Sequence, residues 1–169
     1  RHIQTQINRR GTNPFEDYKL IRNYRKTIEK INPDLILTYT IKPNIYGNYA
    51  AKKYNIPVIM NITGIGSSLA TDNKINNIVK KMYKYACDKA RVVFFQNKSN
   101  YNFFVSNNLV DANKIKLIPG SGVNIDKFQP MENPNRDNII RFLFIGRIMK
   151  EKGIEEYLQV ANNLTRKYS

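Results

Sequence analysis

The chain has 169 residues, and 28 Lys or Arg against 13 Asp or Glu give a formal net charge of +15, which favours anionic partners such as nucleic acid, anionic lipid or phosphorylated substrates. A hydrophobic content of 41% in a chain of this length supports a packed core and excludes a wholly disordered protein. Single copies of cysteine (Cys87) and histidine (His2) exclude a disulfide framework and a metal site built from these two residue types.

The first predicted element is a helix that begins at Asn13-Pro14. The asparagine side chain can accept a hydrogen bond at the cap, and proline fits the first turn. Glu16 and Asp17 follow near the positive end of the helix dipole. Apolar residues at helical spacing then extend the predicted helix to about Lys30.

Short apolar runs then alternate with helical patterns. The runs predict strands over 34–40, 57–63, 91–96 and 114–119, with helices over 44–55, 75–86 and 98–108 between them. This alternation predicts an α/β fold with a Rossmann-like parallel sheet that carries helices on both faces.

Ligands bind such sheets beyond the carboxyl ends of the strands. That rule selects the loops that follow the four predicted strands, because their glycine amides, hydroxyls and polar side chains would meet at one edge. The candidate contacts in these loops are Lys42, Asn44, Thr63, Gly64, Gly66, Ser121 and Gly122. Taken singly, each loop can equally be a plain turn.

The composition changes after the fourth predicted strand. Residues 119–138 are rich in Pro, Gly, Asn and Asp and have no periodicity, so they are predicted to connect two domains. Residues 1–118 then form the first domain, and 139–169 begin a second one with a strand over 139–146 and a helix over 153–168. We expect the chain to be a piece of a longer protein, in which this second domain continues.

Two cations flank the junction between this last strand and helix. Arg147 and Lys152 are positioned to bind an anion, since a helix N-terminus favours phosphate and an Arg can add a bidentate contact. Gly146 and Gly153 would let the backbone approach a ligand closely. The alternative is that both cations are ordinary surface charge paired with nearby carboxylates.

These segments carry a family resemblance. The segment FLFIGRIMKEKGIEEYL (142–158) resembles the G-R-L-x-x-x-K-G segment that opens the C-terminal domain of family-four GT-B glycosyltransferases, and KLIPGSGVNIDKF (116–128) is similar to their interdomain connector. Patterns such as PDLILTYTIKPNIYG and NITGIGS resemble a bacterial branch that builds capsule, O-antigen and related surface glycans. The resemblance extends from Arg9 to Tyr157.

The resemblance implies roles for particular residues. Residues 1–118 would be the latter part of the N-terminal acceptor domain, and the donor domain would begin near 139. Arg147 and Lys152 match the pair that holds the nucleotide-sugar diphosphate and stabilises its charge as the sugar leaves, so that neither a metal nor a cofactor is required. Many members of the family carry a histidine after the second predicted strand, where this chain has Thr63, so no histidine role transfers.

The resulting hypothesis is a retaining glycosyltransferase. It would transfer a sugar from a nucleotide-diphosphate donor to a lipid-linked, polyprenyl-diphosphate glycan. The single cysteine fits a reducing compartment, and we expect a cytoplasmic protein, peripheral at the inner face of the bacterial plasma membrane, where anionic lipid would attract its basic surface. The chain by itself is expected to be inactive, because the family's donor-domain carboxylates would follow Ser169.

Two other classes of protein are compatible with parts of the sequence. A basic α/β nucleic-acid-binding module would use the positive charge and the 19 aromatic residues, although no RNA-binding motif is present and no nucleic acid partner is expected. A non-catalytic glycosyltransferase relative would share the fold without turnover.

Overall fold

The computed structural model describes residues 2–8, 11, 13–65, 74–131 and 139–168. The chain divides into two compact units, unit one over Arg1–Asn124 and unit two over Ile125–Ser169. The division between them falls inside the segment 119–138 that the sequence predicts to be a connector.

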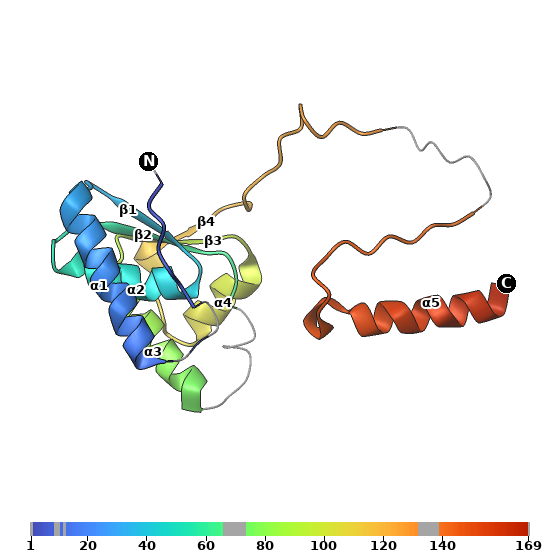
Figure 1. The fold of residues 1–169 in the computed structure, drawn as a ribbon, viewed down its shortest axis with the longest axis horizontal. Coiled ribbons are helices and arrows are strands. Elements are labelled where there is room, and N and C mark those ends of the chain that lie inside the picture. The colour runs from blue at the N-terminus through green and yellow to red at the C-terminus, as the bar shows by residue number, and fades with distance from the viewer. Residues whose placement is uncertain (1, 9–10, 12, 66–73, 132–138, 169) are drawn as a thin grey trace. The chain divides into compact units, whose positions relative to one another are not determined.

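Unit one contains the alternating helices and strands that the sequence predicts (Figure 1). In chain order they are α1 (Pro14–Ile31), β1 (Ile36–Tyr39), α2 (Ile41–Lys52), β2 (Val58–Ile62), α3 (Lys74–Lys89), β3 (Val92–Phe95), α4 (Lys98–Ser106), the short 3-10 helix η2 (Ala112–Lys114) and β4 (Ile115–Leu117). The strands form one sheet in the order β1-β2-β3-β4, and every neighbouring pair is parallel. The predicted α/β fold with a parallel sheet is confirmed.

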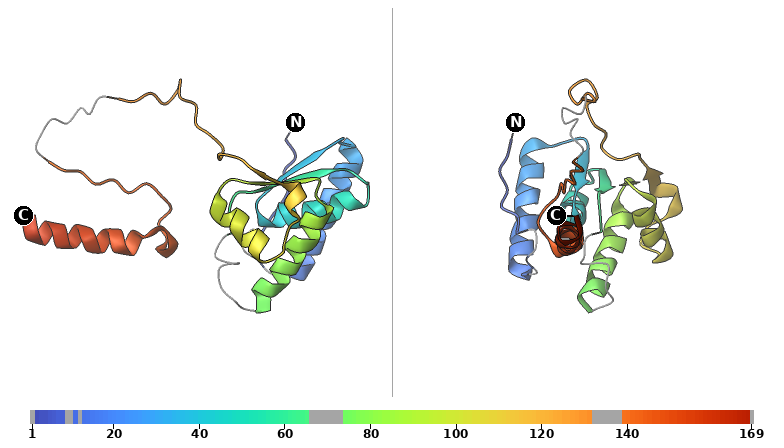
Figure 2. Two further views of the ribbon diagram at one scale, coloured as in Figure 1. Left: turned by 180° about the vertical axis from the view of Figure 1, so that it is seen from behind. Right: turned by 90° about the vertical axis from the view of Figure 1, so that its right-hand side faces the viewer.

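The helices of unit one lie together on one side of this sheet (Figure 2). Thr38 on β1 points toward them and is buried, whereas Leu37 and Tyr39 point to the other face and are 56% and 51% exposed. The expectation of helices on both faces is therefore wrong for the described residues. The reason is topological: right-handed crossovers between strands in sequential order all return on the same side, and covering the second face requires a reversal of strand order.

The hydrophobic core fills the layer between the sheet and the helices. Met60, Val93 and Phe95 from the strands are fully buried there. The ring of Phe104 on α4 packs edge-on against Phe95 and Tyr83, with centroid separations of 5.2 and 5.1 Å. This aromatic contact joins α3 and α4 to the centre of the sheet.

Asparagine side chains set several helix ends. The Asn13 side chain accepts a hydrogen bond from the Phe15 N–H and starts α1, as predicted, and Asn32 ends it in the left-handed conformation with φ 48°. Helix α2 begins at Ile41, three residues before the predicted start at 44. Lys42 and Asn44 consequently lie in the first turns of this helix and not in a loop, because Pro43 is tolerated in a first turn, where it needs no N–H partner.

The described residues of unit two form irregular backbone, then the 3-10 helix η3 (Lys150–Lys152) and helix α5 (Ile154–Tyr168). The predicted strand over 139–146 is wrong, since these residues have no strand conformation. A strand requires a hydrogen-bonded neighbour, and all strands of the described residues belong to unit one. Leu143 and Ile145 remain 80% and 86% exposed, while the Tyr157 hydroxyl donates to the Phe142 carbonyl at 3.0 Å.

Within the part of the chain that the structure describes, no helix has both the length and the apolar character needed to cross a membrane.

Gly47 marks the closest approach of α2 to the sheet. A Cβ added at Gly47 would lie 2.9 Å from the Thr38 methyl group on β1. We expect Gly47→Ala to lower the free energy of unfolding by about 1 kcal/mol, because an overpacking cost of roughly 1–3 kcal/mol exceeds the helix-propensity gain of about 1 kcal/mol. Urea unfolding measures the difference. Gly64→Ala is the control, since no heavy atom lies within 4 Å of the added carbon, and equal stability of the two variants would contradict the close approach.

The pH dependence of stability tests whether the Cys87 thiol is buried in the core. Burial, followed by the charge of Asp88, raises the pKa of the Cys87 thiol from about 9 to about 12. The unfolded chain therefore loses this proton at a lower pH than the folded chain, so stability is complete below pH 9 and is lost between pH 9 and 12. Between pH 9 and 10 the free energy of unfolding should fall more steeply for the wild-type than for Cys87→Ala, by up to about 1.4 kcal/mol per pH unit. Parallel curves would show that the thiol is not buried.

Candidate functional site

The carboxyl ends of the four strands meet at one edge of the sheet, as their parallel pairing requires. In the register, Tyr39 lies opposite Asn61, and Ile62, Phe95 and Leu117 follow one another across the sheet. The loops after β1, β2, β3 and β4 therefore share this edge. Thr40, which follows β1, has φ 68° and ψ 167°, a costly backbone conformation for a β-branched residue and one that is typically found at functional sites.

The structure places most of the predicted loop residues at this edge. Thr63 is exposed and Gly64 is half-buried directly after β2. Ser121 is exposed after β4, and its hydroxyl accepts a hydrogen bond from the Gln96 side-chain amide at 3.4 Å, so the loops after β3 and β4 are in contact. Gly122 has φ 70°, a left-handed conformation that glycine adopts without strain. Gly66 lies outside the described residues.

Asn44 has a different environment from the one that the sequence predicts. It is 1% exposed, and its side-chain N–H donates to the Asn61 carbonyl of β2 at 3.1 Å. It also forms a hydrogen bond with Tyr83, whose pKa is raised mainly by burial. Asn44 therefore ties α2 to the sheet and α3 and does not present its side chain to a ligand.

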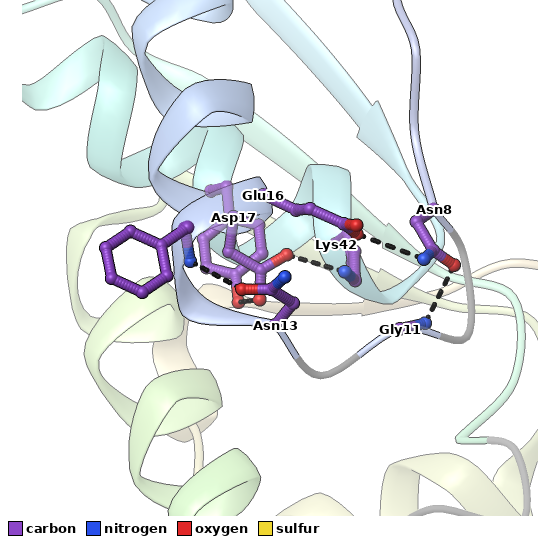
Figure 3. Close-up of polar contacts among 8 residues, drawn as sticks. Asn8, Gly11, Asn13, Glu16, Asp17 and Lys42 are labelled. Atoms are coloured by element: carbon purple, nitrogen blue, oxygen red, sulfur yellow. Dashed lines mark hydrogen bonds and ion pairs between the residues drawn. The ribbon is translucent and has the colours of Figure 1, made fainter.

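Lys42 belongs to a cluster that connects α1 with α2 (Figure 3). Its ammonium group lies 2.5 Å from Asp17 Oδ1, and these side chains are only 11% and 14% exposed. The Tyr46 hydroxyl donates to Asp17 Oδ2 at 2.7 Å. The pKa of Tyr46 is raised by its burial and by this bond to the carboxylate. We call these three residues the Asp17 cluster.

A cavity of about 510 Å³ lies beside the Asp17 cluster. It extends between the N-terminal segment, helix α1 and the start of α2, and we call it the α1 cavity. The described residues that line it are Gln6, Ile7, Asn8, Glu16, Asp17, Lys19, Leu20, Asn23 and Lys42. Of these, the sequence analysis selected only Lys42 as a candidate contact. Glu16 and Asp17 are noticeable in the sequence as acidic residues in the first turn of α1. Acidic residues at that place are equally expected for interaction with the helix dipole, so they did not indicate a binding site.

Arg147 and Lys152 are both exposed in unit two. Arg147 lies in irregular backbone before η3, and Lys152 is the last residue of η3. Gly153 has φ 75° and joins η3 to α5, so a glycine is required at this turn. The carboxylate of Glu155 pairs with Lys150 at 3.2 Å, and both Arg147 and Lys152 are accessible to solvent.

Gly146 precedes Arg147 and is exposed, and a Cβ added to it would lie 3.4 Å from the Phe144 ring. The described residues contain no group of three or more His, Cys, Asp or Glu that could hold a metal ion. The two candidate cations of unit two are exposed, whereas the lining of the α1 cavity is mixed in charge.

Comparison with known proteins matches this chain to one family. The family model for "Glycosyl transferase 4-like" proteins matches residues 1–97, which is more than half of the 169 residues.

Two curated relatives are similar over most of the chain. The N,N'-diacetylbacillosaminyl-diphospho-undecaprenol alpha-1,3-N-acetylgalactosaminyltransferase of Campylobacter jejuni is 29% identical over 96% of this chain. The UDP-Gal:alpha-D-GlcNAc-diphosphoundecaprenol alpha-1,3-galactosyltransferase of Escherichia coli is 24% identical over 85% of it. The chain spans 47% and 39% of the lengths of these two proteins, which is less than half of each.

Among solved structures, MurG of Acinetobacter baumannii aligns with 72% of this chain and 30% of its own, at 17% identity and a TM-score of 0.42.

Proposed function

The chain belongs to the glycosyl transferase 4-like family, and from this premise we propose that the protein is a retaining glycosyltransferase with a nucleotide-diphosphate sugar as donor and a lipid-linked saccharide as acceptor. The observation that carries the proposal is the family match over residues 1–97, together with the similarity to the C. jejuni enzyme over 96% of the chain.

The acceptor class is supported by the names of the two relatives. Both act on a saccharide joined to undecaprenol through a diphosphate. We assign a polyprenyl-diphosphate saccharide to this protein on the same basis. Synthesis of capsule, O-antigen or a related surface glycan is the pathway in which such an acceptor would be extended.

A retaining mechanism is supported by the linkage in those names. Both relatives form an alpha-1,3 bond, and the donor of the E. coli enzyme is UDP-Gal. The sugar of that donor is itself alpha-linked to the diphosphate, so an alpha product retains the configuration. The GT-B architecture, with an acceptor domain that includes unit one and a donor domain that begins in unit two, is part of the same proposal.

Arg147 and Lys152 are assigned to the donor diphosphate. Departure of the sugar leaves negative charge on the nucleoside diphosphate, and fixed cations beside it stabilise the transition state. Arg147 would bind two phosphate oxygens with its planar guanidinium, and Lys152 would act as a mobile point charge. The exposed backbone at Gly146 and the half-buried glycine turn at Gly153 support a close approach of the ligand. Two cations in this role make a metal ion unnecessary.

Substitution of the two cations tests the donor assignment. In the full-length protein, Arg147→Ala and Lys152→Ala should each lower kcat by roughly 100-fold or more, since a charge contact to a diphosphate is worth about 2–3 kcal/mol. Steady-state transfer assays with a sugar nucleotide and a lipid-linked acceptor measure this. Lys150→Ala is the matched control, because Lys150 lies in the same turn and already pairs with Glu155. Unchanged kcat in both variants would remove the proposed role.

Vesicle sedimentation tests the proposed membrane surface. With a net charge of +15 in this chain, the full-length protein should sediment with vesicles that contain anionic phosphatidylglycerol, because each Lys or Arg near the surface contributes about 1 kcal/mol of attraction. Binding should weaken at high salt and be absent with neutral phosphatidylcholine vesicles. Failure to sediment with anionic vesicles at low salt would refute membrane contact.

A further inference from the structure

The α1 cavity holds side chains that the donor chemistry does not use. Given the proposed function, on which this inference rests, we propose that the α1 cavity binds the neutral saccharide of the acceptor and that Asp17 is its principal hydrogen-bond acceptor. The cavity volume of about 510 Å³ lies within the range of roughly 300–1,000 Å³ that is typical of small-molecule sites.

The charges of the lining favour a neutral ligand. Glu16 and Asp17 contribute two carboxylates, and Lys19 and Lys42 contribute two ammonium groups. The ammonium group of Lys42 is already neutralised by Asp17 at 2.5 Å, and this pair is largely shielded from solvent. Because Asp17 balances Lys42 and Glu16 balances Lys19, the described lining residues offer a diphosphate no net positive charge. A saccharide would meet the same carboxylates as hydrogen-bond acceptors.

The geometry of Asp17 fits a pair of neighbouring hydroxyls. Each carboxylate oxygen can accept two hydrogen bonds. Lys42 occupies one position on Oδ1, and Tyr46 occupies one position on Oδ2. These two bonds come from α2 and hold the carboxylate plane fixed, and the hydrogen bonds of the described residues leave one acceptor position on each oxygen. Two adjacent sugar hydroxyls can donate to such a carboxylate at once, and a preorganised acceptor binds them with little loss of entropy. Lys42 and Tyr46 are positioning residues in this arrangement.

Amide side chains complete the lining in a way that suits hydroxyl groups. Asn8 donates to Glu16 Oε2 at 3.0 Å and accepts from the Gly11 N–H at 2.9 Å, and these bonds determine which end of the amide is oxygen (Figure 3). Gln6 and Asn23 add two more amides, and Ile7 and Leu20 supply apolar surface for the carbon side of a sugar ring. Amides can donate and accept, so they match hydroxyls that do both.

The position of the cavity agrees with an acceptor site. Helix α2 follows β1 directly, so Lys42 lies at the carboxyl edge of the sheet where ligands of parallel sheets bind. Helix α1 brings Glu16 and Asp17 to the same edge because its N-terminal turn contacts the first turn of α2 through the Lys42–Asp17 pair.

Steady-state kinetics of the full-length protein test the assignment. Asp17→Asn and Asn23→Ala should each raise KM for a lipid-linked acceptor about tenfold or more, since a hydrogen bond to a charged or well-oriented group is lost. KM for the donor and the rate of donor hydrolysis should stay unchanged. Lys42→Met should act in the same direction as Asp17→Asn, because it frees the carboxylate to rotate. Glu29→Gln, an exposed change on the same helix away from the cavity, is the control and should leave all constants unchanged.

Ligand-detected NMR separates this inference from the proposed function. The methyl glycoside of N-acetylglucosamine should show saturation transfer from the wild-type protein, and Asn23→Ala should abolish the signal. Inorganic pyrophosphate should not displace the glycoside. If the wild-type protein transfers no sugar but this binding pattern holds, the proposed function fails and the cavity assignment stands. Displacement by pyrophosphate, or a rise in donor KM equal to that for the acceptor, overturns the assignment. Because Asn23 forms no part of the Asp17 cluster, Asn23→Ala decides the question even if Asp17→Asn does not fold.

Discussion

Four strands that run in the same direction can be joined only by crossovers that carry the chain back to the starting edge of the sheet. In unit one each crossover contains a helix, so α2, α3 and α4 all begin near the carboxyl edge and end near the other one. The loops after the strands are brought together by this constraint and not by attraction between them. Because the strands follow in sequential order, the same constraint keeps the helices on one side and leaves Leu37 and Tyr39 exposed on the other.

The positive charge of Lys42 and the charges of Arg147 and Lys152 differ in whether they can interact with a ligand. Lys42 is largely buried and bound to Asp17, so its charge serves to hold a carboxylate in place. A largely buried ion pair adds little net stability, because desolvation of both charges offsets their attraction. The main effect of the pair is to fix the orientation of the Asp17 carboxylate. Arg147 and Lys152 are exposed, and the nearby Glu155 pairs with Lys150, so their charge is accessible to an anion.

This contrast fits the two halves of a glycosyl transfer reaction. A departing diphosphate requires positive charge that is free to interact, whereas a saccharide requires fixed acceptors and donors of hydrogen bonds. Polar groups that are preorganised by the fold bind hydroxyls at lower entropic cost than flexible ones. The Asp17 cluster is of that type, since α1 provides the carboxylate and α2 provides both groups that orient it.

Local signals in the sequence determined the helices and strands of unit one and the parallel sheet. Apolar periodicity and the cap at Asn13 depend only on neighbours along the chain, and they predict the elements of unit one to within a few residues. Contacts between distant residues were decided by the tertiary structure alone. The pairing of Lys42 with Asp17, 25 residues away, has no local signal, and neither has the burial of Asn44 against β2. The run 139–146 has the composition of a strand but not its conformation, because a strand is stabilised by hydrogen bonds to a neighbour that its own residues cannot supply.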